Sequence, residues 1–239
     1  MQKKVLVVKN INREGPGIIE KIMQENLIHY QIISLDKGEI FPQPKNYAAV
    51  IILGGPASAN DQTEKMKNEI KKVQTCLSQN IPFLGICLGM QVLVKTVGGR
   101  VYKSPVSEIG FRGPASEFFE IEVIPQGYRD PLLFKLGSKL KVFHLHNETV
   151  ELTEEIKLLG KGKYCTNQIV KVSQNAYGLQ GHFELTARLL DTWMAQDPLL
   201  RKLNRASLLS DFARIRAQYT RTGHQLFTNF FKLAGLIKN

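Results

Sequence analysis

The heptapeptide Gly85-Ile-Cys87-Leu-Gly89-Met-Gln91 constrains the fold of this chain more than any other stretch. It follows the apolar run 81–84 and leads into a helical pattern over 90–97. Glycines two residues before and after a nucleophile, between a strand and a helix, are typical of a nucleophile elbow, a turn too tight for flanking side chains. The Cys87 sulfur would then lie exposed at the helix start, where free N–H groups favour a thiolate. The alternative is an ordinary buried cysteine of the core.

Apolar runs and helical spacing alternate through the first hundred residues. They predict strands at 5–8, 30–35, 48–53 and 83–86, and helices at 15–25 and 61–78. This alternation predicts an α/β fold with a mostly parallel twisted sheet flanked by helices. In such sheets active sites collect at the carboxyl ends of strands, so that Gly54-Gly55-Pro56 and Cys87 would face one another.

Beyond Gly99 the pattern changes to shorter strands joined by turns, which we expect at 100–103, 118–124, 140–145, 149–152, 156–160, 167–172 and 177–182. From Leu185 onward the spacing predicts helices, with apolar stripes over 187–194, 200–219 and 226–233. We expect a main domain over 1–195 and a basic helical C-terminal extension over 196–239. The extension should pack on the domain, because its apolar faces need cover.

Composition narrows the class of protein. The 239 residues, 43% of them apolar, are enough for one large domain with a substantial core. The cysteines Cys76, Cys87 and Cys165 form no plausible disulfide framework, which favours a reducing compartment. No apolar run reaches the length of a membrane span or of a signal-peptide core. We therefore expect a cytoplasmic protein that does not associate with membranes.

Positive charge is concentrated at the C-terminal end. The net charge is +11, and residues 200–239 carry eight Lys or Arg against the single acid Asp211. A basic helical face can bind nucleic acid, anionic lipid or an acidic partner. No aromatic platform or nucleic-acid motif accompanies the charge, so we favour an ordinary solvated face and do not expect nucleic acid as a partner.

A cysteine nucleophile needs a base and a group that orients the base. His182 closes an expected strand, and Glu184 lies two residues further on, where an extended backbone points it to the same side. We therefore predict that His182 is the base and that Glu184 orients it. Two other histidines, His29 and His224, fall in regions expected at the surface.

The developing oxyanion needs backbone donors. The first is expected from Leu88, the residue after the nucleophile, and the second from Gly55, because glycine permits close approach and unusual dihedral angles. Each such donor contributes about 3–4 kcal/mol of transition-state stabilisation. The alternative is that Gly54-Gly55-Pro56 is only a turn.

Three motifs in order carry a resemblance to a known family. Gly54-Gly55-Pro56, the elbow and Gly181-His182-Phe183-Glu184 resemble those of the class I (triad) glutamine amidotransferases, especially free-standing proteins similar to the glutaminase domain of GMP synthase. The resemblance covers about residues 1–195. It implies the family's flavodoxin-like fold, no cofactor, and hydrolysis of the side-chain amide of L-glutamine through a γ-glutamyl thioester on Cys87.

The resemblance also implies substrate contacts. Gly54 and Gln91 match positions that grip the glutamine. The stretch Ser107-Glu108-Ile109-Gly110 is similar to the family's loop beside the substrate, and His146 takes the histidine position of its Ser-His-x-Asp-x-Val stretch. Departures from the family pattern are Leu145 and Glu148 in place of Ser and Asp, and Phe183 in place of proline.

No acceptor domain is expected, because the chain has no room for an ATP-pyrophosphatase module and no P-loop signature. We favour a glutaminase that delivers ammonia to a separate synthetase subunit. A γ-glutamyl peptidase or hydrolase with the same chemistry remains open, as does a catalytically silent binding module that uses the basic extension. We expect no metal site, because no histidine–carboxylate or cysteine pair has convincing ligand spacing.

Overall fold

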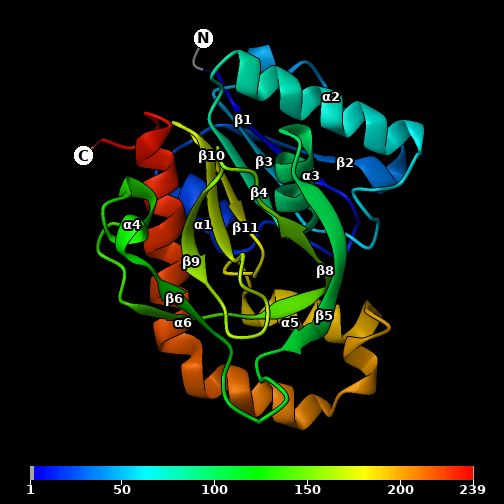
Figure 1. The fold of residues 1–239 in the computed structure, drawn as a ribbon, viewed down its shortest axis with the longest axis vertical. Coiled ribbons are helices and arrows are strands. Elements are labelled where there is room, and N and C mark those ends of the chain that lie inside the picture. The colour runs from blue at the N-terminus through cyan, green and yellow to red at the C-terminus, as the bar shows by residue number, and fades with distance from the viewer. Residues whose placement is uncertain (1–2, 239) are drawn as a thin grey trace.

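The computed structural model describes residues 3–238, and these form a mixed sheet covered on both faces by helices (Figure 1). The strands of this sheet are β1 (Val5–Lys9), β2 (Tyr30–Ser34), β3 (Ala49–Ile52), β4 (Phe83–Ile86), β6 (Glu120–Val123), β7 (Lys139–Lys141), β9 (Lys157–Lys161), β10 (Ile169–Ser173) and β11 (Ala176–Leu179). Their order is β2-β1-β3-β4-β11-β10-β9-β6-β7. A separate antiparallel ribbon pairs β5 (Arg100–Gly110) with β8 (His144–Glu151).

The sheet has a parallel half and an antiparallel half. Strands β2, β1, β3, β4 and β11 pair in parallel, and β10, β9, β6 and β7 continue the sheet through antiparallel pairs. Parallel neighbours need a crossover connection, whereas antiparallel neighbours can be joined by short turns. The expected α/β fold with a helix-flanked sheet is confirmed, and only its first half is wholly parallel.

Two hydrophobic cores lie on opposite faces of the sheet. The helices are α1 (Ile18–Glu25), α2 (Glu64–Ser78), α3 (Leu88–Thr96), α4 (Pro125–Tyr128), α5 (Ala187–Gln196) and α6 (Arg205–Leu233). Val5 and Val7 of β1 pack in one core with α1, α5 and α6, whereas Leu6 and Val8 pack in the other with α2 and α3. The two-residue period of a strand makes this division. Within residues 3–238, no helix has the length and apolar character needed to cross a membrane.

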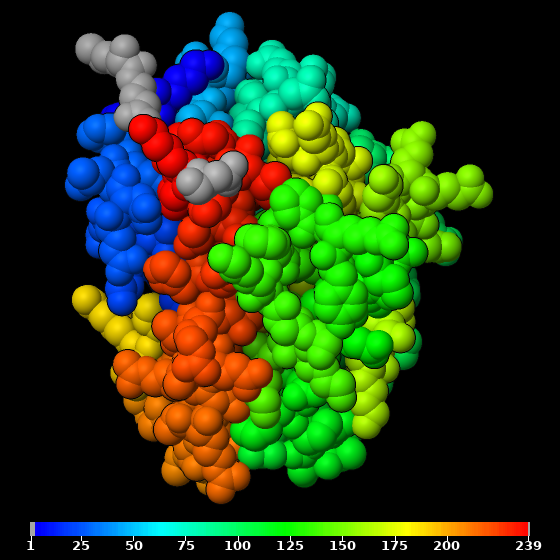
Figure 2. Space-filling view, turned by 90° about the vertical axis from the view of Figure 1, so that its left-hand side faces the viewer, coloured from blue at the N-terminus to red at the C-terminus, as the bar shows by residue number. Residues whose placement is uncertain are grey.

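The C-terminal region differs from the expected pair of helices after Pro198. A single helix, α6, runs over 29 residues and crosses one whole face of the molecule (Figure 2). Gly223 does not interrupt it. A Cβ at Gly223 would lie 2.3 Å from the carbonyl oxygen of Phe183, so this glycine is needed for close packing of the helix. The buried side chains of α6 share a core with β1, and the division of the chain at residue 195 stays a prediction.

Between residues 100 and 152 the observed strands differ from the expected ones, because β5 and β8 pair with one another. The stretch Ser107–Gly110, expected as a loop, is part of β5, where Glu108 pairs with His146. The two strands expected at 140–145 and 149–152 are replaced by β7 and the longer β8, because the ribbon with β5 runs past Thr149. Strand β11 ends at Leu179, and His182 lies beyond it in an isolated bridge to Phe143.

Candidate active site

Cys87 lies in a tight turn between β4 and α3. Its φ of 52° is in the left-handed region, which is uncommon for a residue with a side chain. A Cβ on Gly85 would lie 2.3 Å from the carbonyl of Gly89, and one on Gly89 would lie 2.3 Å from the carbonyl oxygen of Ile52. Only glycine fits at either side of the nucleophile. The turn therefore has the geometry of a nucleophile elbow.

His182 and Glu184 form a buried pair beside Cys87. The His182 Nδ1–H donates to Glu184 Oε1 over 2.6 Å, and the backbone N–H of Phe183 donates to Glu184 Oε2 over 3.0 Å. His182 Cε1 and Cys87 Cβ both lie within 3.4 Å of a Cβ built on Gly54, and the Cys87 thiol donates to the Leu145 carbonyl over 3.9 Å. Burial disfavours the imidazolium, but Glu184 and Cys87 outweigh this cost, so the pKa of His182 is well above its ordinary value. The residues predicted as base, orienter and nucleophile thus lie in one group.

Helices from the end of the chain hold His182 in place. The Tyr219 hydroxyl of α6 donates to the backbone carbonyl of His182 over 2.8 Å and accepts the N–H of Leu185 over 3.2 Å. The Trp193 ring of α5 meets the imidazole edge-on, with 4.9 Å between the ring centres. The C-terminal helices therefore help to build the site as well as cover the sheet.

The two residues predicted to supply oxyanion donors, Gly55 and Leu88, are neighbours in the structure, and their role as donors stays a prediction. Leu88 is the first residue of α3, where N–H groups have no acceptor within the helix. A Cβ on Gly55 would lie 2.6 Å from Asn10 Cβ and 3.4 Å from Leu88 Cδ2. Gly54 adjoins the reacting groups, since its Cβ would lie 3.4 Å from Cys87 Cβ. This close contact brings the backbone of the glycine loop against the start of α3.

A cleft of about 400 Å³ opens at Cys87. Gly55, Gln91 and His146 line it, together with Arg13, Glu14, Pro56, Ala57, Ser58, Lys103, Leu145, Asn147, Glu148, Asp197 and Leu199. The Gln91 amide already donates to the Glu148 carbonyl over 3.2 Å and to Gln180 over 3.4 Å. These bonds hold the Gln91 side chain in the wall of the cleft.

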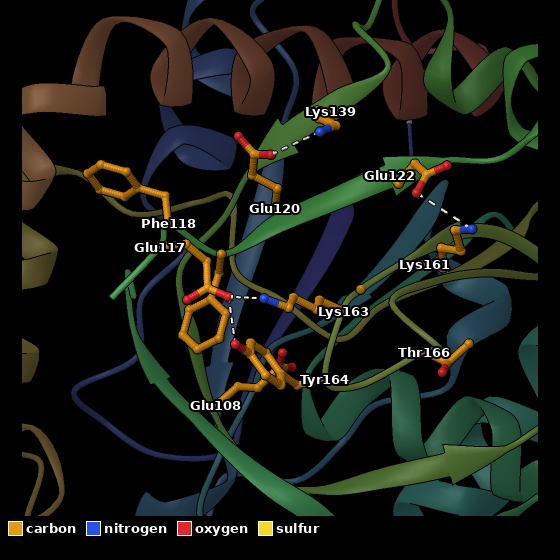
Figure 3. Close-up of a pocket in the computed structure, with 12 residues that line it drawn as sticks. Glu108, Glu117, Phe118, Glu120, Glu122, Lys139, Lys161, Lys163, Tyr164 and Thr166 are labelled. Atoms are coloured by element: carbon orange, nitrogen blue, oxygen red, sulfur yellow. Dashed lines mark hydrogen bonds and ion pairs between the residues drawn. The ribbon is translucent and has the colours of Figure 1, made fainter. Parts of the chain in front are cut away.

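Three of the predicted substrate-binding residues, Gly54, Glu108 and Ile109, do not line this cleft. The buried Glu108 carboxylate contacts His146 Nε2 and accepts from Gln168 Nε2, each over 2.9 Å, and Ile109 packs on the hydrophobic core. Glu108 instead borders a second cavity, of about 440 Å³ (Figure 3). There it lies beside Tyr164, away from the ion pairs that Glu120 and Glu122 form with lysines. Glu108 therefore supports the cleft through His146.

One cluster has a composition that can hold a metal. Glu108, His144 and His146 each offer a ligand atom, and these atoms lie within 4.8 Å of one another. Two histidines and a carboxylate suit zinc. However, His146 Nδ1 donates to the Glu148 carbonyl over 3.0 Å, and Glu108 is satisfied by His146 and Gln168. The cluster therefore needs no ion to satisfy Glu108 and His146, and the expectation of no metal stays a prediction.

Glu14 is a residue of the cleft that the sequence analysis missed. Its side chain is 4% exposed and makes no hydrogen bond to any residue of the described range 3–238, and its Oε2 is buried. Burial raises the pKa of Glu14 to about 7; His182 opposes the rise and Glu184 adds to it. The available signal was an acid just beyond the carboxyl end of the first strand, where ligands of parallel sheets bind.

Comparisons with known proteins agree with this geometry. The family model described as glutamine amidotransferase class-I matches residues 18–201. The glutamine amidotransferase-like protein YfeJ of Salmonella typhimurium is 29% identical over 155 residues, which are 63% of this chain and 62% of YfeJ. A glutamine-hydrolyzing GMP synthase of Thermosipho melanesiensis is 30% identical over 185 residues, which are 77% of this chain but only 33% of the synthase. The chain thus spans less than two thirds of either relative.

Solved structures match over nearly the whole chain. A glutamine amidotransferase from Thermotoga maritima has a TM-score of 0.84 at 25% identity, and the match covers 98% of this chain and 99% of that one. One from Methylobacillus flagellatus has a TM-score of 0.85 at 23% identity, covering 98% and 96%, and shows the shared fold. With the family model matching most of its length, the chain belongs to the class I glutamine amidotransferase family.

Proposed function

We propose that this protein hydrolyses the side-chain amide of L-glutamine to glutamate and ammonia, with Cys87 as the nucleophile. The observation that carries the proposal is that His182, paired with Glu184, lies beside Cys87 at the tight turn between β4 and α3. The family supports the same reaction class.

In the proposed reaction, the Cys87 thiolate attacks the amide carbon while the N–H groups of Leu88 and Gly55 stabilise the oxyanion. His182, whose raised pKa keeps it protonated, gives its proton to the departing nitrogen. Glu184 holds the imidazole in the required orientation. Water then attacks the γ-glutamyl thioester with His182 as the base, which releases glutamate and restores the thiol.

We further propose that the ammonia passes to a separate synthetase subunit. The name of the GMP synthase relative supports an acceptor reaction of this kind, since its matched third is one part of a longer glutamine-hydrolyzing synthase. The acceptor itself and a cytoplasmic location stay predictions.

A second candidate is a γ-glutamyl peptidase. The cleft, at about 400 Å³, falls in the range that holds ligands larger than one amino acid. Its lining also includes Lys103, a charged side chain that a bound peptide could contact. Both candidates share the same acyl-enzyme chemistry.

The test offers L-glutamine and a γ-glutamyl dipeptide in parallel to the purified chain and to Cys87→Ala. Glutamate, ammonia and the free amino acid are measured. Release of ammonia from glutamine by the wild type alone supports the glutaminase. Cleavage of the dipeptide alone supports the peptidase. Equal turnover by Cys87→Ala, or no turnover of either substrate by the wild type, contradicts the proposal for the isolated chain.

A further inference from the structure

The Glu14 carboxyl group is an exception among buried polar groups. Nearly all such groups in folded proteins have a hydrogen-bond partner, and each that lacks one needs an explanation. Within residues 3–238, no side chain or backbone group supplies a partner to the buried oxygen of Glu14, Oε2. Because Glu14 lines the catalytic cleft, a bound ligand can supply one.

A ligand group that bonds to Glu14 Oε2 would lie next to Cys87 and His182. Gly54 marks the place, because a Cβ built there would lie 2.4 Å from Glu14 Oε2, 3.2 Å from His182 Cε1 and 3.4 Å from Cys87 Cβ. Base, nucleophile and carboxyl therefore converge on one point beside the glycine loop. A side chain at residue 54 would fill that point.

The segment that carries Glu14 is held on both sides. The Arg13 guanidinium forms an ion pair of 2.6 Å with Asp197, and the Arg13 carbonyl accepts from the Trp193 indole over 3.1 Å. On the other side, the N–H of Ile18 donates to the Glu184 carbonyl over 2.8 Å. The segment that carries Glu14 is thus fixed between α5 and the backbone of Glu184, and Glu14 cannot easily turn toward solvent for a partner.

We propose that Glu14 binds the scissile nitrogen of the substrate, accepting a hydrogen bond from its N–H. The contact would orient the amide so that its nitrogen faces His182. This inference rests on the proposed amide hydrolysis and names the residue that recognises the leaving group. Glu14 neither gains nor loses a proton in the step. The Cys87 sulfur bonds to carbon, the carbon–nitrogen bond breaks with its electron pair on nitrogen, and the proton comes from His182.

The scissile nitrogen is a better partner than the α-ammonium group of the substrate. Three carbon atoms separate the α-nitrogen from the amide carbon, whereas the leaving nitrogen is bonded to the carbon that Cys87 attacks. Glu14 faces the same point as Cys87 and His182. At pH 8, above the raised pKa of about 7, Glu14 is a carboxylate, which matches a donor on the leaving group and offers nothing to an ester oxygen, since that oxygen has no hydrogen to donate.

The experiment compares L-glutamine with L-glutamate γ-methyl ester, which share the glutamyl part and differ in the leaving group. The wild type and Glu14→Leu are assayed on both at pH 8, where Glu14 is ionised, and unfolding temperatures are measured. We expect kcat/KM for glutamine to fall about 10–100-fold in Glu14→Leu, the range for a hydrogen bond to a charged group. Turnover of the ester should stay within about threefold, and the unfolding temperature should rise because an unpaired buried carboxyl is removed.

Glu69→Leu is the matched control. Glu69 is also fully buried, and its Oε2 likewise has no partner within residues 3–238, but its Oε1 accepts from Asn10 over 3.0 Å and it does not line the cleft. Its replacement should lower the unfolding temperature and leave the ratio of amide to ester turnover unchanged. If Glu14→Leu does not fold, Glu14→Ala is measured in the same way.

Two results would overturn the role of Glu14, and a third would refute the proposed function itself. Equal losses on amide and ester would assign Glu14 to the shared glutamyl part. Unchanged turnover of both would remove Glu14 from the reaction. A wild-type protein that cleaves neither substrate would instead refute the proposed function on which the inference rests.

Discussion

Two buried carboxyl groups flank His182, and their surroundings are opposite. Both oxygens of Glu184 have partners, one on the imidazole and one on the backbone N–H of Phe183. Glu14, from a loop near the other end of the chain, has none within the described residues 3–238. A carboxylate whose oxygens are both hydrogen-bonded within the protein serves to hold its neighbours in place. A buried carboxyl oxygen without a hydrogen bond lowers stability, and in a cleft it is available to a ligand.

The largest effect should come from Cys87→Ala, which sets the baseline for both carboxyl groups. Loss of a nucleophile of this kind lowers turnover by about 10⁴-fold or more. The fold should survive, because alanine retains only the Cβ that already occupies this turn. Ammonia release and circular dichroism would measure the two. Appreciable residual turnover would mean that another group attacks the substrate.

Glu184→Gln should have the next largest effect. Removing the orienting charge of a triad lowers kcat by about 10³–10⁴-fold, less than removal of the base by His182→Ala. The pKa of His182 should also fall, since Glu184 is the main group that raises it. The pH profile of kcat/KM would report this change. A loss as complete as that of His182→Ala would show that Glu184 has a further role, and an unshifted profile would remove it as the orienter.

The pH dependence of stability should also distinguish Glu14 from Glu184. The pKa of Glu14 is raised from 4.5 to about 7 in the folded protein, so the folded state holds a proton there that the unfolded state has lost. Stability therefore falls as pH rises from about 4.5 to about 7, by about 3 kcal/mol at about 1.4 kcal/mol per pH unit. Glu14→Leu removes this loss.

Urea unfolding at pH 5 and pH 8 would check this expectation. The stability gained in Glu14→Leu should be larger at pH 8 than at pH 5. A gain of the same size at both values would mean that the Glu14 carboxyl does not titrate between them. Glu184→Gln is the useful contrast, because it should lose stability at pH 8 by removing the partner of a buried imidazolium.

The smallest effect is expected on the outer face of α6. Arg214 and Arg216 are exposed, and reversing both charges should change stability by less than about 0.5 kcal/mol and leave glutamine turnover unchanged. On the inner face, Tyr219→Phe should cost about 1–3 kcal/mol, because it leaves the buried N–H of Leu185 without a partner and the His182 carbonyl with only the Phe143 N–H at 3.4 Å. A drop in turnover on charge reversal would instead give the basic face a part in the reaction.

Much of the fold was predictable because its signals are local. The alternation of apolar runs and helical spacing predicted β1, β2, β3, β4 and the helices between them to within a few residues. The antiparallel half was harder, because the extent of β5 and β8 depends on their pairing with one another. The two apolar stripes expected at 200–219 and 226–233 belong to one helix, α6, in which Gly223 allows close approach to Phe183. Packing decided both, and packing involves residues far apart in the sequence.

The sequence by itself determined the elbow and the pair His182 and Glu184, since glycine spacing and a two-residue offset are properties of the local backbone. Only the tertiary structure decided which other side chains meet them. Glu14 reaches the cleft because contacts with Trp193 and Asp197, some 180 residues away, hold its loop. Glu108 lies behind His146 because β5 pairs with β8. Burial without a partner is a property of the packed interior, which no local pattern records.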